Sequence, residues 1–378
     1  MRTALIEAPR PNSVFAKYKS QYILPNILLD IAGVLSCKAE FPNDEIKLYN
    51  ALKDRSFILP EADRYIVNIS ECVEKTREDV YIIDLLKQLR AAQNNLMSNS
   101  QVYLVGWYAW LNREHLEKDF KVLHPLLYEM EFTDKSPDEI IPRWDLINMS
   151  EAPEIAGKRR ATLRTIRGCP HKCEMCPVNL VYNQQTYKFS LDWIKKQIQT
   201  LYNMGFREIN FIDDNFLFDK KRSIELLQYL IQEKKTSLKG MRYMFHEGME
   251  VNQAQDEFLV HLLKEAGFHD IKLGVESLNP KTLEYINKPY KDPKLAIKAI
   301  ENFNKYGMKP NLLIIFGLPT DTEEDYIKMI DVLSKLKVKI RAQKLYGYQG
   351  KQYTSPVSKE RLSELMNKLL EKTGSAIW

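Results

Sequence analysis

Glycine is scarce in this chain: 378 residues include 14 glycines, roughly half of what an average usage of about 7% would supply. Long apolar runs are also lacking. The longest, "YILPNILLDIAGVLSC", is interrupted by Pro25, Asn26 and Asp30, which excludes a membrane-spanning helix. The first residues, "MRTALIEAPRPN", lack the charged and then apolar pattern of a secretory signal. We therefore expect a cytoplasmic protein with no membrane partner.

Neither sign of charge dominates, because 55 Lys and Arg stand against 50 Asp and Glu, for a net charge of +5. This surplus is too small to indicate a nucleic-acid partner, although it is compatible with an acidic electron-transfer protein. The composition, 44% hydrophobic and 28% charged, is typical of a globular protein. At this length we expect one large domain and a smaller one.

Cysteine is limited to five residues, and three of them are clustered. Cys37 and Cys72 stand alone in apolar surroundings, and we expect both to be small buried side chains. Cys169, Cys173 and Cys176 follow the spacing C-x3-C-x2-C. In the reducing cytoplasm such a cluster binds metal or performs redox chemistry more often than it forms disulfides.

The region before residue 134 alternates strand and helix signals. The segments "RTALIEAP", "ADRYIVNIS" and "SQVYLVGW" are short β-branched or aromatic runs, and each predicts a strand. Residues 77–96 predict a helix, with a capping box at Thr76–Asp79. Strands separated by a helix predict a small parallel α/β layer. The polar, proline-bearing residues 134–160 predict a linker.

From residue 162 onward the alternation becomes regular. The predicted strands are "ATLRTIR", "EINFID", "MRYMFHE", "DIKLGVE", "PNLLIIFG" and "KIRAQKLYG". The predicted helices cover residues 191–204, 219–235, 254–266, 280–305 and 321–336. Six such units predict an α/β fold, a partial (β/α)6 barrel preceded by a small Rossmann-like α/β domain. Chemistry in such barrels gathers at the carboxyl ends of the strands, and the cysteine cluster follows the first strand at that end.

Three cysteines in a short loop match the ligand requirement of an iron–sulfur cubane with one open iron. Each thiolate binds one iron, and a cubane needs four ligands. An open coordination position is typical of catalytic metal sites, because another molecule can bind there. The alternative is a zinc site completed by His171. His171 lies two residues from both Cys169 and Cys173, and no second metal-binding pair lies nearby, so the spacing favours the cluster.

Residues 162 to about 350 resemble the radical S-adenosylmethionine superfamily. The three cysteines match its signature, and the likeness continues through "INFIDDNFLFD", "AGFHDIKLGVESLNPKTLEYINK" and "IIFGLPTDTEEDY" in the order that the family uses. Met175 stands before the third cysteine, where the family commonly has an aromatic residue. The resemblance implies an enzyme with a [4Fe–4S] cluster that binds S-adenosyl-L-methionine (SAM). It also implies reductive cleavage of SAM to a 5′-deoxyadenosyl radical, which abstracts hydrogen from substrate.

The same resemblance assigns residues around the nucleotide. The segment "FIDDNF" stands where the family contacts the methionine ammonium, but the usual Gly-Gly-Glu form is absent, so the choice among its acidic and amide groups stays open. The segments "GVES" and "FGLP" correspond to the ribose, carboxylate and adenine contacts. One glutamate of "FHEGMEV" can meet cofactor or substrate. The implied cofactor-binding residues are Asp213, Asp214, Asn215, Glu247, Glu276, Ser277, Gly317 and Leu318.

Three histidines and one basic stretch carry weaker predictions. His261 and His269 are expected to be structural, whereas His246 lies near the expected cavity. The basic stretch "LSKLKVKIRAQK" is expected to be a solvated surface, although it could dock reduced ferredoxin or flavodoxin.

An α/β domain before such a barrel resembles the subgroup with an N-terminal cobalamin-binding-type domain. The motif that places a histidine on cobalt is missing, and residues 1–150 contain only Gly33 and Gly106. A domain that lays backbone against a large corrin would need more glycine. We therefore expect a degenerate domain, with cobalamin possible but not favoured. The predicted segments are this domain at 1–133, the linker at 134–160, the radical SAM barrel at 161–350 and a C-terminal helix at 351–378.

The sequence therefore predicts a radical SAM enzyme that acts on an unidentified small molecule or peptide. The enzymatic alternative is a cobalamin-dependent radical SAM C-methyltransferase. The non-enzymatic alternative is a zinc-stabilised binding protein that uses His171 and the three cysteines.

Overall fold

A computed structural model describes most of the chain in two compact units. The described residues are 1–8, 26–37, 45–50, 57–69, 80–95, 100–150, 152–245, 247–345 and 352–375. The N-terminal unit is built mainly from Met1–Gly157, and the barrel unit from Lys158–Asn179, Asn183–Gly347 and Lys351–Trp378. The capping box at Thr76–Asp79, Cys72 and His246 lie outside the described residues, as does the side chain of Cys37.

The N-terminal unit contains a parallel sheet in the strand order β2-β1-β3-β4-β5. These strands are β1 (Arg2–Glu7), β2 (Glu45–Asn50), β3 (Arg64–Asn68), β4 (Gln101–Val105) and β5 (Lys121–Val122). The helices are α1 (Asn26–Cys37), α2 (Val80–Gln93), α3 (Trp107–Leu111) and α4 (Arg113–Leu116). The expected Rossmann-like α/β layer is therefore present.

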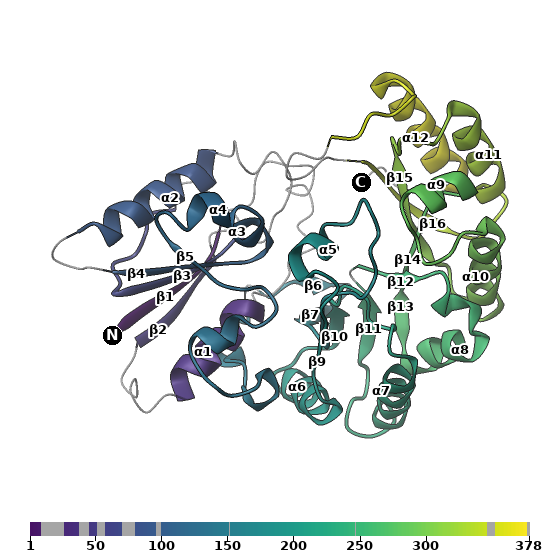
Figure 1. Ribbon diagram of the computed structural model, residues 1–378. Helices are drawn as coiled ribbons and strands as arrows, with labels where there is room; N and C mark the ends of the chain where they lie inside the picture. Colours follow the sequence, from purple (N-terminus) through teal and green to yellow (C-terminus); the bar gives the residue numbers. More distant parts are fainter. Residues whose placement is uncertain are drawn as a thin grey trace. The chain divides into compact units, whose positions relative to one another are not determined.

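Alternation along the central strands explains why helices cover both faces of this sheet. In β1, Ala4 and Ile6 join the core cluster that contains Leu85 of α2, whereas Leu5 joins the cluster that contains Leu28 of α1. Successive side chains of a strand point to opposite faces, so a continuous apolar run is buried on both sides. Helices α1 and α2 accordingly lie on opposite faces of the sheet (Figure 1).

The expectation of three strands and one main helix in this region was too low. The stretch "YILPNILLDIAGVLSC" was considered only as an interrupted apolar run, but α1 begins at Asn26, directly after Pro25, and contains Asp30. Asp30 is buried. Its carboxylate accepts a hydrogen bond of 2.6 Å from the Tyr128 hydroxyl, which offsets part of the cost of burying it. β2 was also missed, because "EIKLYN" is an edge strand with polar side chains.

Part of the expected linker packs onto the N-terminal unit. Residues 134–160 include two 3₁₀ turns, Pro137–Glu139 and Trp144–Leu146, and the start of the first barrel strand. A Cβ on Gly33 of α1 would lie 2.2 Å from the Ile141 carbonyl oxygen, so glycine is required for this close contact.

The barrel unit contains two sets of three parallel strands. The first set is β7 (Lys158–Leu163), β10 (Glu208–Phe211) and β11 (Arg242–Phe245), and the second is β14 (Lys272–Glu276), β15 (Asn311–Phe316) and β16 (Lys339–Lys344). β13 (Phe268–Asp270) pairs with β11, and β12 (Met249–Glu250) pairs with β14. Each of the six main strands overlaps a predicted one, although the first predicted strand, residues 161–167, covers only the end of β7 and continues into β8. Shorter strands are β6 (Glu154–Ile155), β8 (Ile166–Arg167) and β9 (Tyr187–Lys188).

Helices follow the strands and run along their outer side, as Figure 1 shows for α7, α8, α10 and α11. The helices are α5 (Pro177–Tyr182), α6 (Leu191–Asn203), α7 (Lys220–Glu233), α8 (Glu257–Ala266), α9 (Pro280–Tyr285), α10 (Pro293–Lys305), α11 (Glu323–Leu333) and α12 (Lys359–Thr373). A 3₁₀ turn, η6 (Gln253–Gln255), precedes α8. In α10 the buried residues Ala296, Ala299, Ile300 and Phe303 form the apolar stripe expected of a surface helix.

The predicted helix at 280–305 is wrong as one element, because α9 ends at Tyr285 and α10 begins at Pro293. Asn287 has a left-handed backbone with φ 52°, and Pro289 and Pro293 cannot continue a helix. The intervening turn brings Lys288 toward the cysteine loop, as described below.

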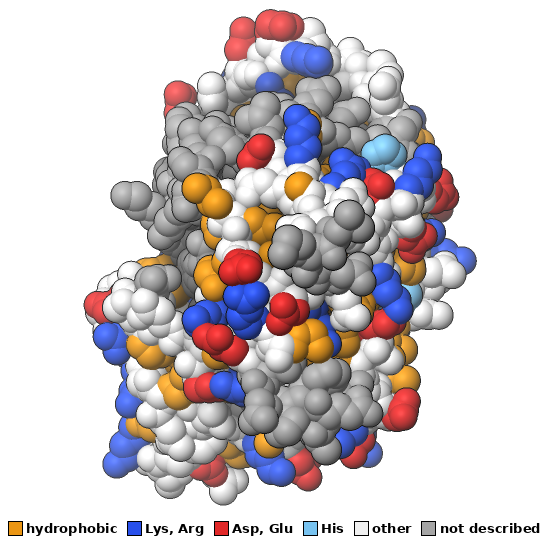
Figure 2. All heavy atoms as spheres, turned by 90° about the vertical axis from the view of Figure 1, so that its left-hand side faces the viewer, with side chains coloured by type: hydrophobic (Ala, Val, Ile, Leu, Met, Phe, Trp, Pro, Cys, Tyr) orange, Lys and Arg blue, Asp and Glu red, His pale blue; other side chains and the backbone are white. Residues whose placement is uncertain are grey.

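Two surface features complete the fold. Among the described residues, no helix is both long and apolar enough to cross a membrane. On the face shown in Figure 2, Lys and Arg side chains lie next to Asp and Glu side chains, in agreement with the nearly balanced composition.

Candidate functional site

The cysteine loop, residues 168–176, begins directly after β8, near the carboxyl end of β7, and ends at α5. Gly168 opens it with a left-handed backbone, φ 79°, which favours glycine. The Cys176 N–H donates to the Cys173 carbonyl at 3.1 Å, and Pro177 occupies the first turn of α5. Cys169, Cys173 and Cys176 are free thiols. One loop therefore presents all three predicted ligands at the end of the barrel where chemistry is expected.

Burial raises the pKa of all three thiols, that of Cys169 to about 11. A thiol in such surroundings stays protonated at neutral pH unless a positive charge compensates the thiolate. A bound metal provides that charge and deprotonates a coordinating thiol. The setting therefore suits metal ligands better than free nucleophiles.

His171 does not act as a free fourth ligand in this structure. Its Nε2 lies 2.6 Å from Oε1 of Glu250, at the carboxyl end of β12. Among the described residues, no three Cys, His, Asp or Glu side chains are arranged to hold a single metal ion. The imidazole of His171 is thus already engaged by Glu250.

Asp213 follows β10 and faces the turn before the cysteine loop. Its Oδ1 accepts hydrogen bonds from the Thr165 N–H at 2.7 Å, the Thr165 hydroxyl at 3.1 Å and the Ile166 N–H. Its Oδ2 is buried and has no hydrogen-bond partner among the described residues. Burial raises the pKa of Asp213 to about 7, against the effect of these bonds. Asp213 thus supports the path of the chain into the cysteine loop.

Asp214 reaches the cysteine loop itself. Its Oδ2 accepts a hydrogen bond of 2.8 Å from the Gly168 N–H, one residue before Cys169. Burial raises the pKa of Asp214, whereas the charge of Arg164 opposes the shift. The charge of Glu247, which is exposed, adds to the increase, so Glu247 lies within electrostatic reach of Asp214.

Asn215 is the third residue of this segment and contacts a cysteine directly. It is 3% exposed, and its Nδ2 donates to Cys169 Sγ at 3.7 Å. The same amide donates to Glu250 Oε1, and its Oδ1 accepts a hydrogen bond of 2.8 Å from Gln253 Nε2. Asn215 therefore connects Cys169 to the segment after β11.

Glu250 and Gln253 were not among the predicted site residues. Glu250 belongs to the quoted segment "FHEGMEV", but the prediction chose Glu247, three residues earlier. β12 is only two residues long, so its strand period was too short to show which glutamate faces the loop. The carboxylate of Glu250 receives His171, Asn215 and Gln253 on one oxygen, Oε1.

Glu276 ends β14 and pairs with a buried lysine. Its backbone is left-handed, with φ 64°, and the register of β14 against β15 shifts at this point. Lys288 Nζ donates to Glu276 Oε1 at 3.2 Å, and both residues are 8% exposed. Burial lowers the pKa of Lys288, but the charges of Glu276 and of a Cys173 thiolate outweigh it, so the net shift is upward. Lys288 was also missed, because it lay inside a predicted helix.

The turn that carries Lys288 holds the other side of the cysteine loop. The Glu174 N–H donates to the Ile286 carbonyl at 2.9 Å, and Asn287 Nδ2 donates to the Lys172 carbonyl at 3.2 Å. The cysteine loop is therefore held both by the segment after β10 and by the turn between α9 and α10.

Ser277 is placed differently from its expected role. Its hydroxyl donates to Asp321 Oδ1 at 3.1 Å and accepts from the Asn279 N–H at 3.0 Å. Asp321, 1% exposed, also accepts from the Thr282 hydroxyl. These bonds join the loop after β14 to the loop after β15.

Gly317 and Leu318 follow β15 beside an apolar cluster. The cluster comprises the buried residues Ile286, Ile315 and Leu318, against which Met175 and Leu345 pack. Gly317 has φ 94°, and its N–H donates to the Tyr326 hydroxyl at 2.8 Å. Met175 of the cysteine loop thus packs against a cluster that includes Leu318 of the "FGLP" segment.

His261 and His269 both contact other side chains of the barrel unit. His269 Nε2 lies 2.9 Å from Glu208 Oε2 at the amino end of β10. The ring of His261, in α8, packs 5.1 Å from the ring of Tyr306.

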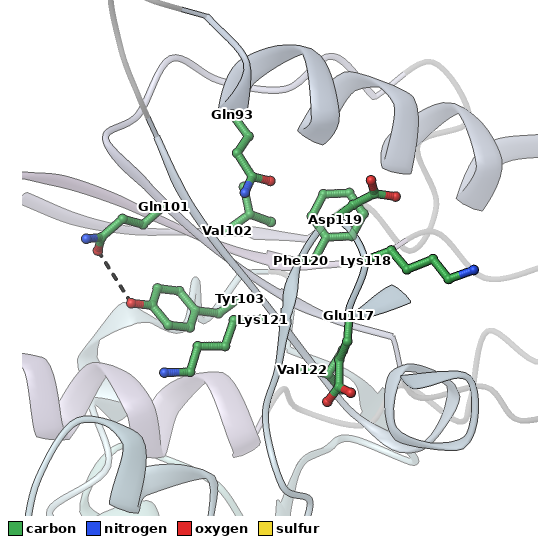
Figure 3. A pocket seen from close by; sticks show the side chains of 10 residues that line it. All are labelled: Gln93, Gln101, Val102, Tyr103, Glu117, Lys118, Asp119, Phe120, Lys121 and Val122. Atoms are coloured by element: carbon green, nitrogen blue, oxygen red, sulfur yellow. Dashed lines mark hydrogen bonds between the residues drawn. The ribbon is translucent and has the colours of Figure 1, made fainter. Parts of the chain in front are cut away.

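A cavity of about 590 Å³ lies in the N-terminal unit and contains none of these residues. It is lined by the end of α2, the start of β4 and the segment before β5 (Figure 3). Two of its charged side chains are paired: Asp119 with Arg90 at 2.7 Å, and Lys121 with Glu131. The cavity lies at the amino ends of the strands, where catalytic groups are not expected in parallel sheets.

A parallel barrel with three free cysteines after its first strand is the arrangement that the sequence predicted for an iron–sulfur enzyme. Residues 163–333 match the model of the Radical SAM superfamily. This part of the chain is therefore a radical SAM domain, as the cysteine spacing and the segments after β10, β14 and β15 predicted.

Two curated relatives share part of the chain. It is 30% identical over 203 residues to an uncharacterized methyltransferase of Pyrococcus horikoshii, covering 53% of this chain and 42% of the relative. It is 27% identical over 158 residues to hopanoid C-2 methylase of Rhodopseudomonas palustris, covering 42% of this chain and 30% of the relative. The chain therefore spans less than half the length of these relatives.

A solved structure has the same fold. The radical SAM methyltransferase TsrM from Kitasatospora setae, with cobalamin and a [4Fe–4S] cluster bound, matches with a TM-score of 0.66 at 13% identity. The match covers 90% of this chain and 74% of that chain. The expected fold, a radical SAM barrel preceded by a Rossmann-like α/β domain, is confirmed.

Proposed function

We propose that Cys169, Cys173 and Cys176 hold a [4Fe–4S] cluster and that the protein cleaves SAM reductively to a 5′-deoxyadenosyl radical, which abstracts hydrogen from substrate. The cysteine loop carries this proposal, because it presents three free thiols, and His171 is engaged by Glu250. The donor set fits the group, since iron–sulfur clusters take thiolate ligands. When bound, the cluster supplies the electron that breaks a carbon–sulfur bond of the sulfonium.

Asp214 is our candidate for the methionine ammonium. Asp213 uses one oxygen for the turn at Thr165 and Ile166, and its other oxygen is buried. The carboxylate of Asp214 lies beside the cysteine loop, where its Oδ2 accepts a hydrogen bond from the Gly168 N–H. A carboxylate beside Cys169 can accept charge-assisted hydrogen bonds from an ammonium group.

Lys288 is our candidate for the methionine carboxylate, in place of Ser277. The Ser277 hydroxyl is already a donor to Asp321 and an acceptor for Asn279. Lys288 offers a buried ammonium beside Glu276 and Cys173, and among the described residues Glu276 is its one hydrogen-bond acceptor, so the ammonium can also donate to an anion. Glu276 keeps its proposed role at the ribose hydroxyls, and Ser277 orients the strand end that carries it.

The adenine is proposed to lie against the apolar cluster formed by Ile286, Ile315 and Leu318 with Met175. Its members come from the cysteine loop, the strand β15 and the turn after α9. An aromatic base gains free energy from such apolar surface, and the backbone at Gly317 and Leu318 can meet the base edge. We propose that Glu247, which is exposed and lies near Asp214, faces the substrate.

Cobalamin-dependent methyl transfer is a second candidate, and the relatives favour it. Both curated relatives above are named for methyl transfer, and TsrM was solved with cobalamin. The carboxyl end of β4 offers a test of fit. A Cβ on Gly106 would lie 2.5 Å from the Ile69 carbonyl oxygen, so this glycine serves packing inside the unit rather than an open cradle. We therefore retain hydrogen abstraction without a corrin as the first candidate.

The substrate is proposed to be a small molecule or a peptide. The electron is proposed to come from a reduced ferredoxin or flavodoxin, for which the basic segment at β16 is a candidate docking surface. This segment includes Lys339 and Lys344, both at the ends of β16.

One experiment separates these candidates. The full chain is reconstituted anaerobically with iron and sulfide, with and without hydroxocobalamin, and incubated with dithionite and methyl-labelled SAM. 5′-Deoxyadenosine, methionine and protein-bound corrin are measured in the same sample. Formation of 5′-deoxyadenosine without bound corrin supports the first candidate. Stoichiometric corrin that acquires the labelled methyl group supports the second, and the absence of both products contradicts both.

A further inference from the structure

Cys169 differs from the other two cysteines in the side chain that approaches its sulfur. Asn215 Nδ2 lies 3.7 Å from Cys169 Sγ and is oriented to donate a hydrogen bond to it. Asn215 is 3% exposed, so water does not compete for this amide. Cys173 instead lies near the ammonium of Lys288, and Cys176 receives a backbone hydrogen bond from Val178.

The Asn215 amide is held in place by two neighbours. Gln253 Nε2 donates to Asn215 Oδ1 at 2.8 Å, which fixes the amide plane, and Glu250 accepts from Asn215 Nδ2. Gln253 in turn accepts from the Glu250 N–H at 3.0 Å, so both neighbours belong to one short turn between β12 and η6. This arrangement defines which end of the amide faces the sulfur.

A donor at a cluster sulfur acts on the cluster's electron affinity. A one-electron reductant, such as dithionite or reduced flavodoxin, adds one negative charge to the cluster, and part of that charge is carried by the thiolate sulfurs. A hydrogen bond donated to such a sulfur stabilises the reduced state more than the oxidised state, which raises the reduction potential. Removal of the donor must therefore lower the potential.

We propose that the Asn215 amide raises the reduction potential of the cluster through Cys169, and that Glu250 and Gln253 are positioning residues for this amide. This inference rests on the proposed function, because it requires the cluster to bind at the cysteine loop. It changes the role expected for Asn215 from a contact of the nucleotide to a contact of a cluster ligand.

The test is a potentiometric titration of the reconstituted full chain without SAM, followed by electron paramagnetic resonance (EPR) of the reduced cluster. The variants are Asn215→Ala, which removes the donor, and Gln253→Ala, which leaves the donor but releases its orientation. The control is Asn304→Ala, because Asn304 bonds the Lys337 and Met308 carbonyls at the opposite end of the barrel strands. Iron and sulfide contents are measured for every protein.

The expected result is a shift to more negative potential in Asn215→Ala, a smaller shift of the same sign in Gln253→Ala and no shift in Asn304→Ala. An unchanged or more positive potential in a fully loaded Asn215→Ala protein would overturn the inference and leave the proposed function intact. If Asn215→Ala takes up no cluster, Gln253→Ala decides in the same way. Failure of both variants to bind iron would also overturn the inference. A residue that only adjusts the reduction potential is not needed for the cluster to bind. A wild-type protein without iron contradicts the proposed function and this inference together.

Discussion

At the amino ends of the barrel strands, charged side chains bind one another, whereas at the carboxyl ends they bind the cysteine loop. Glu208, fully buried in β10, receives Arg160 from β7, Arg242 from β11 and His269 from β13. These ion pairs connect neighbouring strands of the sheet. Their charges are satisfied within the protein, so we assign them to stability.

At the carboxyl ends, by contrast, polar side chains lie beside the cysteines and can still form hydrogen bonds or ion pairs with a ligand. Asp214 binds the Gly168 N–H, Asn215 binds Cys169, and Lys288 lies beside Cys173 with Glu276 as its partner. Burying charges without full pairing costs stability, and such groups concentrate at functional sites. The two ends thus separate a structural charge cluster from a proposed cofactor site within one barrel.

The difference between the two ends of the barrel predicts that substitution of a cysteine in the loop causes the largest loss of activity. Cys173→Ala removes one of three iron ligands, so 5′-deoxyadenosine formation falls below detection in the anaerobic assay with dithionite. The unfolding temperature changes little, because the side chain is only partly buried. Cys72→Ser, which alters a cysteine outside the loop, serves as the matched control and retains activity. Product formation at the wild-type rate by Cys173→Ala would contradict the assignment.

The largest loss of stability is predicted at the amino ends. Glu208→Gln leaves the buried Arg160 and the partly buried Arg242 without this counter-charge, which costs about 3–5 kcal/mol in urea unfolding. Glu323→Gln breaks the exposed pair with Arg361 and costs about 1 kcal/mol or less. If the charge cluster at the amino ends takes no part in the cofactor site, Glu208→Gln protein that is still folded should bind iron. Equal losses in the two variants would remove the distinction between the buried and exposed pairs.

The pH dependence of the unfolding free energy also tests the assignment of Glu208 to stability. Burial alone would raise the pKa of Glu208, but the hydrogen bond with His269 and the charge of Arg160 outweigh it and hold the pKa at about 2. Because the folded pKa lies below the ordinary value of 4.5, the stabilisation is complete above that pH. It is lost as the pH falls from 4.5 toward 2. The difference in unfolding free energy between wild type and Glu208→Gln should therefore be constant from pH 7 to about 5 and become smaller, without vanishing, as the pH falls to 3.

A smaller effect on SAM binding is predicted at Lys288. Lys288→Met keeps the apolar stem but removes the ammonium, so the dissociation constant for SAM rises roughly 10- to 100-fold, as for the loss of a charged hydrogen bond. The measurement is the SAM dependence of the EPR signal of the reduced cluster. Lys291→Met is the matched control, because Lys291 is 40% exposed and pairs with Glu284 at 3.4 Å. Equal affinities in the two variants would remove Lys288 from the proposed site.

The smallest effect is predicted at Asp213. Asp213→Asn keeps an oxygen for the Thr165 and Ile166 donors and removes a buried charge, so the unfolding free energy at pH 8 changes by about 1 kcal/mol or less. SAM affinity stays at the wild-type value, whereas Asp214→Asn lowers it. Isothermal titration with the loaded protein compares the two. A loss of affinity in Asp213→Asn alone would reverse the proposed roles of the two aspartates.

The barrel and the cysteine loop were predictable from the sequence because their signals are local. Six short apolar strands alternate with amphipathic helices, and the C-x3-C-x2-C spacing lies in one loop. Pro289 and Pro293 are local signals of the break between α9 and α10, which the single predicted helix at 280–305 did not use. In the N-terminal unit, α1 was not predicted, and the partner of its buried Asp30, Tyr128, lies 98 residues away, where no local pattern shows it.

The partners of the cysteines could not be predicted in the same way. Glu250 and Lys288 meet the loop from segments 79 and 115 residues away, as the contacts His171–Glu250 and Asn287–Lys172 illustrate. No local period identifies such contacts. The resemblance located the segment Asp213–Asn215 but could not assign its three side chains, because each bonds a different target.

The most direct test of the open-cluster site is the Mössbauer spectrum of the chain reconstituted with ⁵⁷Fe, recorded with and without SAM. The three-thiol site predicts four irons and about four sulfides per chain, with one iron whose spectrum changes when SAM is added. Cys173→Ala should lose this signature, and Cys72→Ser should keep it. A spectrum unaffected by SAM, or a protein that retains one zinc and no iron, would contradict the assignment.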